Sequence, residues 1–395
     1  MTLPRKELFD LPEGVIYLDG NSLGPLPRAV RARLDEVVSR DWGGELIRGW
    51  NTCGWMDQPA RVGDRIARLI GAPPGSVVMG DTLSIKVFQA LAAALTMRPD
   101  RRVILSDRGN FPTDLYMAEG LIALKDRGYA LRLAAPEAVM DAIDDSVAAV
   151  MLTEVDYRTG RRHDMAALTR ATHHAGAVMI WDLAHSAGAL KVDVAGCGAE
   201  FAVGCTYKYL NGGPGAPAFI YLRPDLADTA RPYLAGWLGH DAPFAFETGY
   251  RPAPGIARMR VGTPPVLQMS ALEAALTVWD GVDMADLRAA SVALCERFIA
   301  GVEATCPGLR LISPRAAKSR GSQVSFAFPD GYAAMQALIS RGVIGDFRGP
   351  DVMRFGFAPL YIDAGDVDAA VEALADILAT RAWDRPEFRT RNAVT

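Results

Sequence analysis

The chain has 395 residues, of which 50% are hydrophobic and 22% are charged, and its formal net charge is -4. This is the composition of a globular protein with two or three domains, and the weak negative charge gives no reason to expect a nucleic acid or an anionic membrane as partner. No apolar stretch suits a secretion signal or a membrane span and the five cysteines form no C-x-x-C pair, so we expect a cytoplasmic protein without a disulfide framework or a zinc site.

The first motif in chain order is YLDGNSLGPLP, residues 17–27, in which Gly20 to Gly24 match the G-x-S-x-G elbow of serine hydrolases. An elbow serine follows a central strand and leads directly into a helix. Here two prolines follow the motif before any strand of a sheet is predicted. We therefore interpret Ser22 as part of an N-terminal turn and not as a nucleophile.

Between residues 59 and 222, short apolar runs alternate with amphipathic stretches. The pattern predicts strands at 76–80, 102–106, 148–155, 177–182, 201–205 and 217–222. It predicts helices at 61–70, 83–95, 113–128 and 165–176. Several of the strand runs are continuously apolar, which is typical of a mainly parallel sheet covered by helices on both faces. We expect an α/β domain with right-handed crossovers.

After Gly255 the pattern changes to long helical stretches that alternate with three strand-like runs, at 309–313, 323–328 and 352–360. This predicts a smaller α+β domain, joined to the first by a segment rich in proline and glycine. We divide the chain into an N-terminal segment that packs over the active site or the small domain, a large α/β domain and a C-terminal α+β domain, at residues 1–44, 45–265 and 266–395.

Two polar residues follow neighbouring strand runs of the large domain. Asp182 ends the run 177–182 and Lys208 follows the run 201–205, so both are expected at the carboxyl edge of the sheet, where open α/β sheets bind ligands. Lys208 lies between two tyrosines, where partial burial would expose a nucleophilic amine. The alternatives are a helix N-cap for Asp182 and a solvated surface charge for Lys208. Together the two residues match the arrangement that binds pyridoxal phosphate, in which a lysine forms the Schiff base and an aspartate keeps the pyridinium nitrogen protonated.

Lysine is scarce in this chain, which limits the candidates for such chemistry. For the other five lysines we expect solvated surface positions. The lysines are Lys6, Lys86, Lys125, Lys191, Lys208 and Lys318.

Six sequence blocks resemble those of kynureninases, a family of fold type I, aspartate-aminotransferase-like pyridoxal phosphate enzymes. In chain order the blocks are YLDGNSLGP, FPTD, WDLAHSAGA, GCTYKYLNGGPGAPAF, GWLGH and VGTPP. They occur in the family's order, and the resemblance extends from about residue 17 to about residue 361, nearly the whole chain. One departure is Leu238, which stands where an aromatic residue is usual.

The resemblance implies roles for the matched residues. Lys208 is the expected Schiff-base lysine, Asp182 the pyridinium partner and Tyr207 a phosphate contact that could also transfer a proton. The other expected cofactor contacts are Leu83, Ser84, Phe111, Asp114, His185, Trp237 and Thr263. Leu83 and Ser84 also follow a strand and open a helix, whose free N–H groups suit a phosphate. Phe111 and Asp114 could instead simply start a helix, and His185 could be an ordinary core histidine. The family position of Thr263 reaches the site of a partner subunit, which implies a homodimer.

Arg354 lies in the run VMRFGFAP, residues 352–359. Strand alternation places Arg354 on the same face as Gly356 and Ala358, which leave room for a bidentate carboxylate beside the guanidinium. The alternative is an arginine that faces solvent on a half-exposed strand. The resemblance places the arginine that binds the α-carboxylate of the substrate here.

The implied activity is hydrolysis of the Cβ–Cγ bond of L-kynurenine to anthranilate and L-alanine, in tryptophan breakdown or in the supply of NAD precursors. The sequence leaves open whether 3-hydroxy-L-kynurenine is also a substrate. A cysteine-desulfurase-like lyase or an aminotransferase would share Asp182 and Lys208 but not GWLGH or VGTPP. A serine-dependent carbon–carbon hydrolase would need Ser22 and no cofactor.

Overall fold

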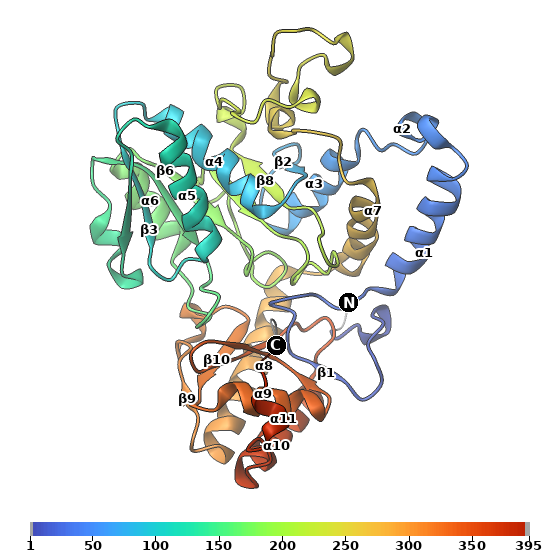
Figure 1. The fold of residues 1–395 in the computed structure, drawn as a ribbon, viewed down its shortest axis with the longest axis vertical. Helices are drawn as coiled ribbons and strands as arrows, with labels where there is room; N and C mark the ends of the chain where they lie inside the picture. The colour runs from blue at the N-terminus through green and yellow to red at the C-terminus, as the bar shows by residue number, and fades with distance from the viewer. Residues whose placement is uncertain (1–2, 392–395) are drawn as a thin grey trace.

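The computed structural model describes residues 3–391, and its largest unit is a seven-stranded sheet with the order β2-β8-β7-β6-β5-β3-β4 (Figure 1). Neighbouring strands from β7 to β4 are parallel, whereas β8 is antiparallel to both β7 and β2. The mainly parallel α/β sheet predicted from the sequence is confirmed. Its strands are β2 (Val77–Met79), β3 (Val103–Asp107), β4 (Ala130–Ala134), β5 (Val147–Thr153), β6 (Val178–Asp182), β7 (Phe201–Gly204) and β8 (Phe219–Leu222).

Both faces of this sheet are covered. In β6, Val178 and Ile180 join an apolar cluster that contains the buried alanines of α4, whereas Met179 and Trp181 join a separate cluster. Because successive side chains of a strand point to opposite faces, burial on both faces explains why the strand runs are continuously apolar. The covering helices are α3 (Gln58–Leu69), α4 (Leu83–Met97), α5 (Pro112–Lys125) and α6 (Met165–His174).

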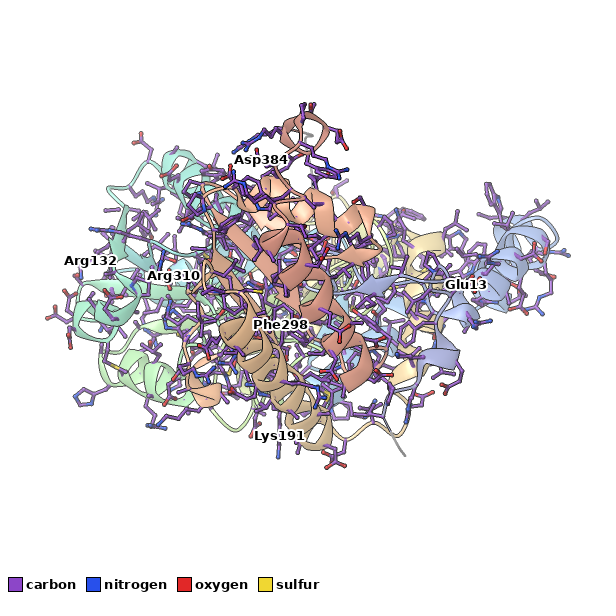
Figure 2. The ribbon with its side chains drawn as sticks, turned by 90° about the horizontal axis from the view of Figure 1, so that it is seen from below. Glu13, Arg132, Lys191, Phe298, Arg310 and Asp384 are labelled. Carbon is purple, nitrogen blue, oxygen red and sulfur yellow. The ribbon has the colours of Figure 1, made fainter. Side chains whose placement is uncertain are left out.

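The C-terminal part holds a four-stranded antiparallel sheet of order β12-β13-β10-β9. Helix α8 packs against α10 and β10, and α9 packs against β12 and β13. Phe298 of α8, labelled in Figure 2, has its ring centroid 4.8 Å from that of Phe355 in β13. The elements are α8 (Met284–Thr305), β9 (Arg310–Leu311), β10 (Gln323–Ala327), α9 (Gly331–Ser340), β12 (Asp346–Arg348), β13 (Val352–Gly356), α10 (Ala364–Ala379) and α11 (Pro386–Arg389).

The N-terminal segment, the blue ribbon in Figure 1, runs from beside the C-terminal sheet to helix α7 of the upper part of the molecule. Strand β1 (Ile16–Tyr17) pairs in parallel with β11 (Val343–Ile344), next to the C-terminal sheet. Further along the chain, α1 (Arg28–Glu36) packs against α7 (Val266–Ala275) and is followed by α2 (Gly49–Thr52). The turn between β1 and α1 is therefore held at both ends.

Several elements carry no sequence prediction. Strand β4 lies at the edge of the large sheet and is only partly buried, so its apolar pattern is weak. Helix α9 is buried around most of its surface and lacks the polar face that marks an amphipathic helix. Strands β11 and β12 are two and three residues long, too short to show a period.

The prediction of a solvated surface position is wrong for Lys86, which is fully buried in the first turns of α4. Its Nζ donates to Asp81 Oδ2 at 3.1 Å, to Gln89 Oε1 at 2.9 Å and to the carbonyl of Met259 at 3.1 Å. Burial lowers the pKa of Lys86, and the charge of Asp81 opposes this effect. The ammonium therefore ties the loop after β2 to the segment that leads into α7.

Of the helices in residues 3–391, none combines the length and the apolar character needed to cross a membrane.

Candidate active site

Lys208 and His185 meet at the carboxyl edge of the large sheet. Lys208 follows β7, and its Nζ lies 2.9 Å from His185 Nε2 in the turn after β6. Burial lowers the pKa of His185 well below its ordinary value, and the positive charges of Lys208 and Arg354 lower it further. A neutral imidazole can accept a hydrogen bond from a lysine ammonium. His185 Nδ1 is buried and has no hydrogen-bond partner in the described chain, so the ring has an unused polar atom beside Lys208.

Asp182 is the last residue of β6 and is 2% exposed. It lies opposite Val203 of β7. The structure therefore places Asp182 on the strand next to the one that precedes Lys208, as predicted. Asp182 Oδ1 accepts the N–H of Ala184 at 2.8 Å, and Oδ2 lies 3.2 Å from the Thr153 hydroxyl. Turns rather than a helix follow Asp182, which excludes the N-cap alternative.

A second carboxylate is buried close to Asp182. Asp114 lies in the first turn of α5, is 1% exposed, and its Oδ2 has no hydrogen-bond partner among the residues described. Burial raises the pKa of Asp114 well above its ordinary value, and the charge of Asp182 raises it further. Burial also raises the pKa of Asp182, against the opposing charge of Lys208. Two desolvated carboxylates near one lysine favour a further positive group between them.

This arrangement fits pyridoxal phosphate. A protonated pyridine nitrogen would supply the missing positive charge beside Asp182. The unpaired Oδ2 of Asp114 and the unpaired Nδ1 of His185 are buried polar atoms that a ligand with hydrogen-bonding groups would satisfy. The Lys208 amine lies at the same edge of the sheet, 2.9 Å from Nε2 of the His185 imidazole that carries the unpaired Nδ1.

Two aromatic rings flank the amine. The ring centroids of Phe111 and Tyr207 lie 5.9 Å and 5.8 Å from Lys208 Nζ. Phe111 is 43% exposed, and its ring meets Tyr157 edge to face at 5.3 Å, which leaves a face available for stacking. The sulfur of Cys205 and burial raise the pKa of Tyr207, so its phenol keeps its proton near neutral pH.

No sequence pattern predicts the row of buried, hydrogen-bonded side chains behind Asp182. The Thr153 hydroxyl lies within hydrogen-bond distance of Asp182 and of Asn110 Oδ1, and Asn110 Nδ2 donates to the Ser106 hydroxyl at 3.0 Å. Asn110 immediately precedes Phe111 and accepts its backbone N–H at 2.7 Å. This row links Asp182, at the end of β6, to Phe111, the N-cap residue of α5.

Leu83 and Ser84 open α4, as predicted, and the N-cap Thr82 makes no side-chain cap to the helix. The first N–H groups of a 15-residue helix are thus left for an anion. Trp237 is 41% exposed and Thr263 is exposed. Among the described residues, none of these four makes a hydrogen bond or a ring contact with Lys208.

The N-terminal turn that contains Ser22 lies directly over the lysine loop. The Gly24 N–H donates to the carbonyl of Tyr207 at 2.7 Å, and a Cβ on Gly24 would come within 2.3 Å of the Lys208 carbonyl. Only glycine allows this approach. The Ser22 hydroxyl donates to Asp346 Oδ2 at 2.7 Å and accepts from Arg354 Nη2 at 3.0 Å. These partners include no histidine, and the one carboxylate among them is paired with Arg354, so the hydroxyl lacks the histidine base of a serine hydrolase.

We expect Ser22→Ala to retain turnover, with kcat lowered less than about tenfold, because the lost hydroxyl removes neutral and charge-assisted hydrogen bonds but no nucleophile. Steady-state kinetics of the variant loaded with cofactor check this. Complete inactivity in a folded variant would revive the serine hydrolase alternative.

Arg354 does not face solvent. It is 1% exposed in β13, so the alternative of a surface arginine is wrong. Nε donates to Asp346 Oδ1 at 2.6 Å, and Nη2 also donates to Asp346. Nη1 donates to the carbonyl of Tyr157 at 2.5 Å. The space beside the guanidinium that the sequence suggested for a substrate carboxylate is thus occupied on one edge by Asp346.

Comparisons with known proteins identify relatives of this chain. The family model described as "Kynureninase C-terminal domain" matches residues 287–374. A curated kynureninase of Burkholderia pseudomallei strain 1106a is 55% identical over 99% of this chain and 96% of the relative, and one of Pseudomonas fluorescens is 52% identical over the same shares.

Solved structures show the same fold at low identity. An apo cysteine desulfurase from Thermococcus onnurineus NA1 superposes with a TM-score of 0.80 at 19% identity, covering 96% of this chain and 99% of the other. A C-DES mutant with glycine covalently linked to its PLP cofactor gives a TM-score of 0.79 at 18% identity, covering 94% and 99%.

Proposed function

The chain belongs to the kynureninase family, and from this membership we propose that the residues around Lys208 form its active site. The enzyme is a pyridoxal-phosphate-dependent hydrolase that cleaves the Cβ–Cγ bond of L-kynurenine to anthranilate and L-alanine. The observation that carries the site assignment is the pairing of β6 and β7, which brings buried Asp182 next to the loop that holds Lys208.

Pyridoxal phosphate, when bound, supplies an electron sink for the charge that develops at the substrate carbons. Lys208 holds the cofactor through its amine and, once that amine is free, takes the proton from the substrate Cα. Neutral His185, 2.9 Å from Lys208 Nζ, accepts a hydrogen bond from the ammonium and keeps it oriented. Asp182 holds the proton on the pyridine nitrogen, because a buried carboxylate without a contacting cation favours a positive partner.

The remaining contacts are proposed on the same basis. Phe111 stacks on the ring and Asp114 supplies a buried oxygen to it. Leu83 and Ser84 present backbone N–H groups to the phosphate, and Tyr207 and Trp237 add polar contacts to it. Because its pKa is raised, the phenol of Tyr207 keeps its proton near neutral pH, so Tyr207 acts as a hydrogen-bond donor there.

We propose a homodimer in which Thr263 reaches the site of the partner subunit. Thr263 is exposed, and so is Leu267, four residues further along the chain. Two residues before Thr263, the Val261 carbonyl accepts the N–H of Leu238, which follows the exposed Trp237. Exposed apolar side chains gathered on one part of a surface are typical of a subunit interface. Light scattering of the purified protein should give twice the chain mass, and a monomer that retains full activity would contradict the proposal.

Arg354 is proposed to hold the α-carboxylate of the substrate, through donors that Asp346 does not use. Arg354→Leu removes a charge-assisted pair of about 1.5–3 kcal/mol, or roughly 10- to 150-fold in binding. If the pair acts equally in the ground and transition states, the loss appears in KM, and kcat falls too if the pair also orients the Cα–H bond.

An analogue of kynurenine that lacks the carboxylate is the sharper probe of Arg354. The wild type should discriminate strongly against this analogue, whereas Arg354→Leu should treat the two compounds almost alike. Undiminished discrimination by the variant would show that the carboxylate is bound elsewhere.

The activity itself is tested by incubating the cofactor-loaded protein with L-kynurenine and measuring anthranilate by fluorescence. The same assay with the 3-hydroxy compound decides which substrate is preferred. Formation of a keto acid in place of anthranilate would instead indicate an aminotransferase.

A further inference from the structure

Asp346 faces Arg354 across two paired strands of the C-terminal sheet. The two residues are direct cross-strand partners in the antiparallel pair β12–β13, so the backbone register holds their side chains on the same face. Asp346 is 2% exposed, and its two oxygens take the Nε and Nη2 donors of Arg354. This bidentate contact fixes the plane of the guanidinium as well as its position.

Asp346 is itself held from two further directions. Arg348 Nη2 lies 3.0 Å from Asp346 Oδ2, and the Ser22 hydroxyl donates to the same oxygen at 2.7 Å. Although burial acts to raise it, the bonds and charges of Arg354 and Arg348 keep the pKa of Asp346 below its ordinary value. The carboxylate is therefore ionised at neutral pH and makes contacts with three side chains.

The donors that remain on Arg354 point away from Asp346. A guanidinium carries five N–H groups, and Nη1 and Nη2 form an edge of their own beside the one that contains Nε. On that edge Nη2 donates to the Ser22 hydroxyl at 3.0 Å and Nη1 donates to the Tyr157 carbonyl at 2.5 Å. The second Nη1 N–H has no hydrogen-bond partner among the described residues and can serve another acceptor. The ring of Tyr157 in turn contacts Phe111, 5.9 Å from Lys208 Nζ.

The charges of this cluster favour an added anion. Arg348 and Arg354 share the carboxylate of Asp346. The next carboxyl group, Asp19, is partly buried, and this burial together with the charge of Asp346 raises its pKa to about 7. Near neutral pH the cluster therefore carries two full positive charges, one full negative charge and a partly protonated acid. A substrate carboxylate would balance the excess positive charge.

We propose that Asp346 is a positioning residue: it holds the Nε edge of Arg354 so that the remaining Nη1 N–H is directed to the substrate's α-carboxylate. This rests on the proposed role of Arg354 and extends it to a residue that does not touch the substrate. Asp346 acts through Arg354, and Arg348 keeps Asp346 in place.

The test uses the full-length, cofactor-loaded enzyme with the substitution Asp346→Asn, which keeps the size of the side chain but removes its charge. We expect KM for L-kynurenine to rise about tenfold, with kcat within about threefold of wild type, because the arginine loses its orientation but not its charge. Discrimination against the analogue without a carboxylate should fall by a similar factor. Asp346→Glu, which restores the charge on a longer stem, should recover part of the loss.

Asp368→Asn is the matched control. Asp368 also takes Nε and Nη2 of an arginine, Arg297, at 2.5 Å and 2.6 Å, but on the surface. Removing a bidentate pair there should leave KM, kcat and the discrimination unchanged. A KM that falls in Asp346→Asn would overturn the proposal, because it would mean that Asp346 competes with the substrate for Arg354.

A double-mutant cycle separates this proposal from the proposed function. If Asp346 acts only through Arg354, the variant Asp346→Asn/Arg354→Leu should have the same KM as Arg354→Leu alone, within about twofold. If the two substitutions instead raise KM additively, the positioning role is contradicted. The proposed function is judged separately, by whether the wild-type enzyme produces anthranilate. If Asp346→Asn does not fold, as thermal unfolding would show, the same cycle with Asp346→Glu gives the answer.

Discussion

Lys208→Ala should lower kcat/KM for L-kynurenine by roughly 10⁴-fold or more, the largest effect expected of any single substitution in this enzyme. The variant loses both the amine that holds the cofactor and the base that takes the Cα proton, and a positioned acid–base group alone contributes about 10²–10⁴-fold. The fold should survive, because Lys208 lies in a loop after β7 and its Nζ contacts only His185 by hydrogen bond in the described chain. Anthranilate fluorescence measures the loss of kcat/KM, and circular dichroism shows whether the fold is retained.

Lys318→Ala is the control for this experiment. Lys318 is exposed near the C-terminal sheet, and its loss should leave kcat/KM and the visible spectrum unchanged. Substantial turnover by Lys208→Ala, combined with an unchanged spectrum, would assign the cofactor to another lysine. Buried Lys86 would then be the first alternative to examine, since burial lowers its pKa too.

Asp182→Asn is expected to keep the fold and some bound cofactor but to lose roughly 100-fold in kcat, the equivalent of about 3 kcal/mol. An amide of the same shape can still take the N–H of Ala184, which Asp182 accepts at 2.8 Å. It cannot hold a proton on the pyridine nitrogen, so the electron sink is weakened. KM should change less than kcat, because the interaction strengthens as charge develops.

Asp225→Asn removes an exposed carboxylate that pairs with Arg223 at 2.7 Å and serves as the control with no expected effect on kcat. Near-normal turnover by a folded Asp182→Asn enzyme would contradict the role given to Asp182.

The sequence could predict the meeting of Asp182 with the Lys208 loop because it depends on local patterns. Each residue follows a continuously apolar run, and parallel strands bring their carboxyl ends to one edge of a sheet. The fold class followed from such apolar runs and the family from six ordered sequence blocks, and both are confirmed. The division at residues 44 and 265 and the individual cofactor contacts remain predictions.

Two buried contacts of charged residues could not be predicted in this way. Asp346 meets Arg354 through a three-residue strand, which is too short to leave a period in the sequence. Lys86 is buried because Met259, 173 residues away, accepts its hydrogen bond. In both cases a charged residue is buried with a hydrogen-bonding partner that no sequence pattern marks, and charged residues are otherwise rarely buried.

The most direct test of the site is to reduce the cofactor-loaded enzyme with borohydride, which makes a C=N bond between a lysine and the cofactor permanent, and to map the labelled peptide by mass spectrometry. Only six lysines can carry the label. We predict that it is found on Lys208, in the peptide that contains GCTYKYLNGG. A label on any of the other five lysines, with Lys208 unmodified, would contradict the proposed active site.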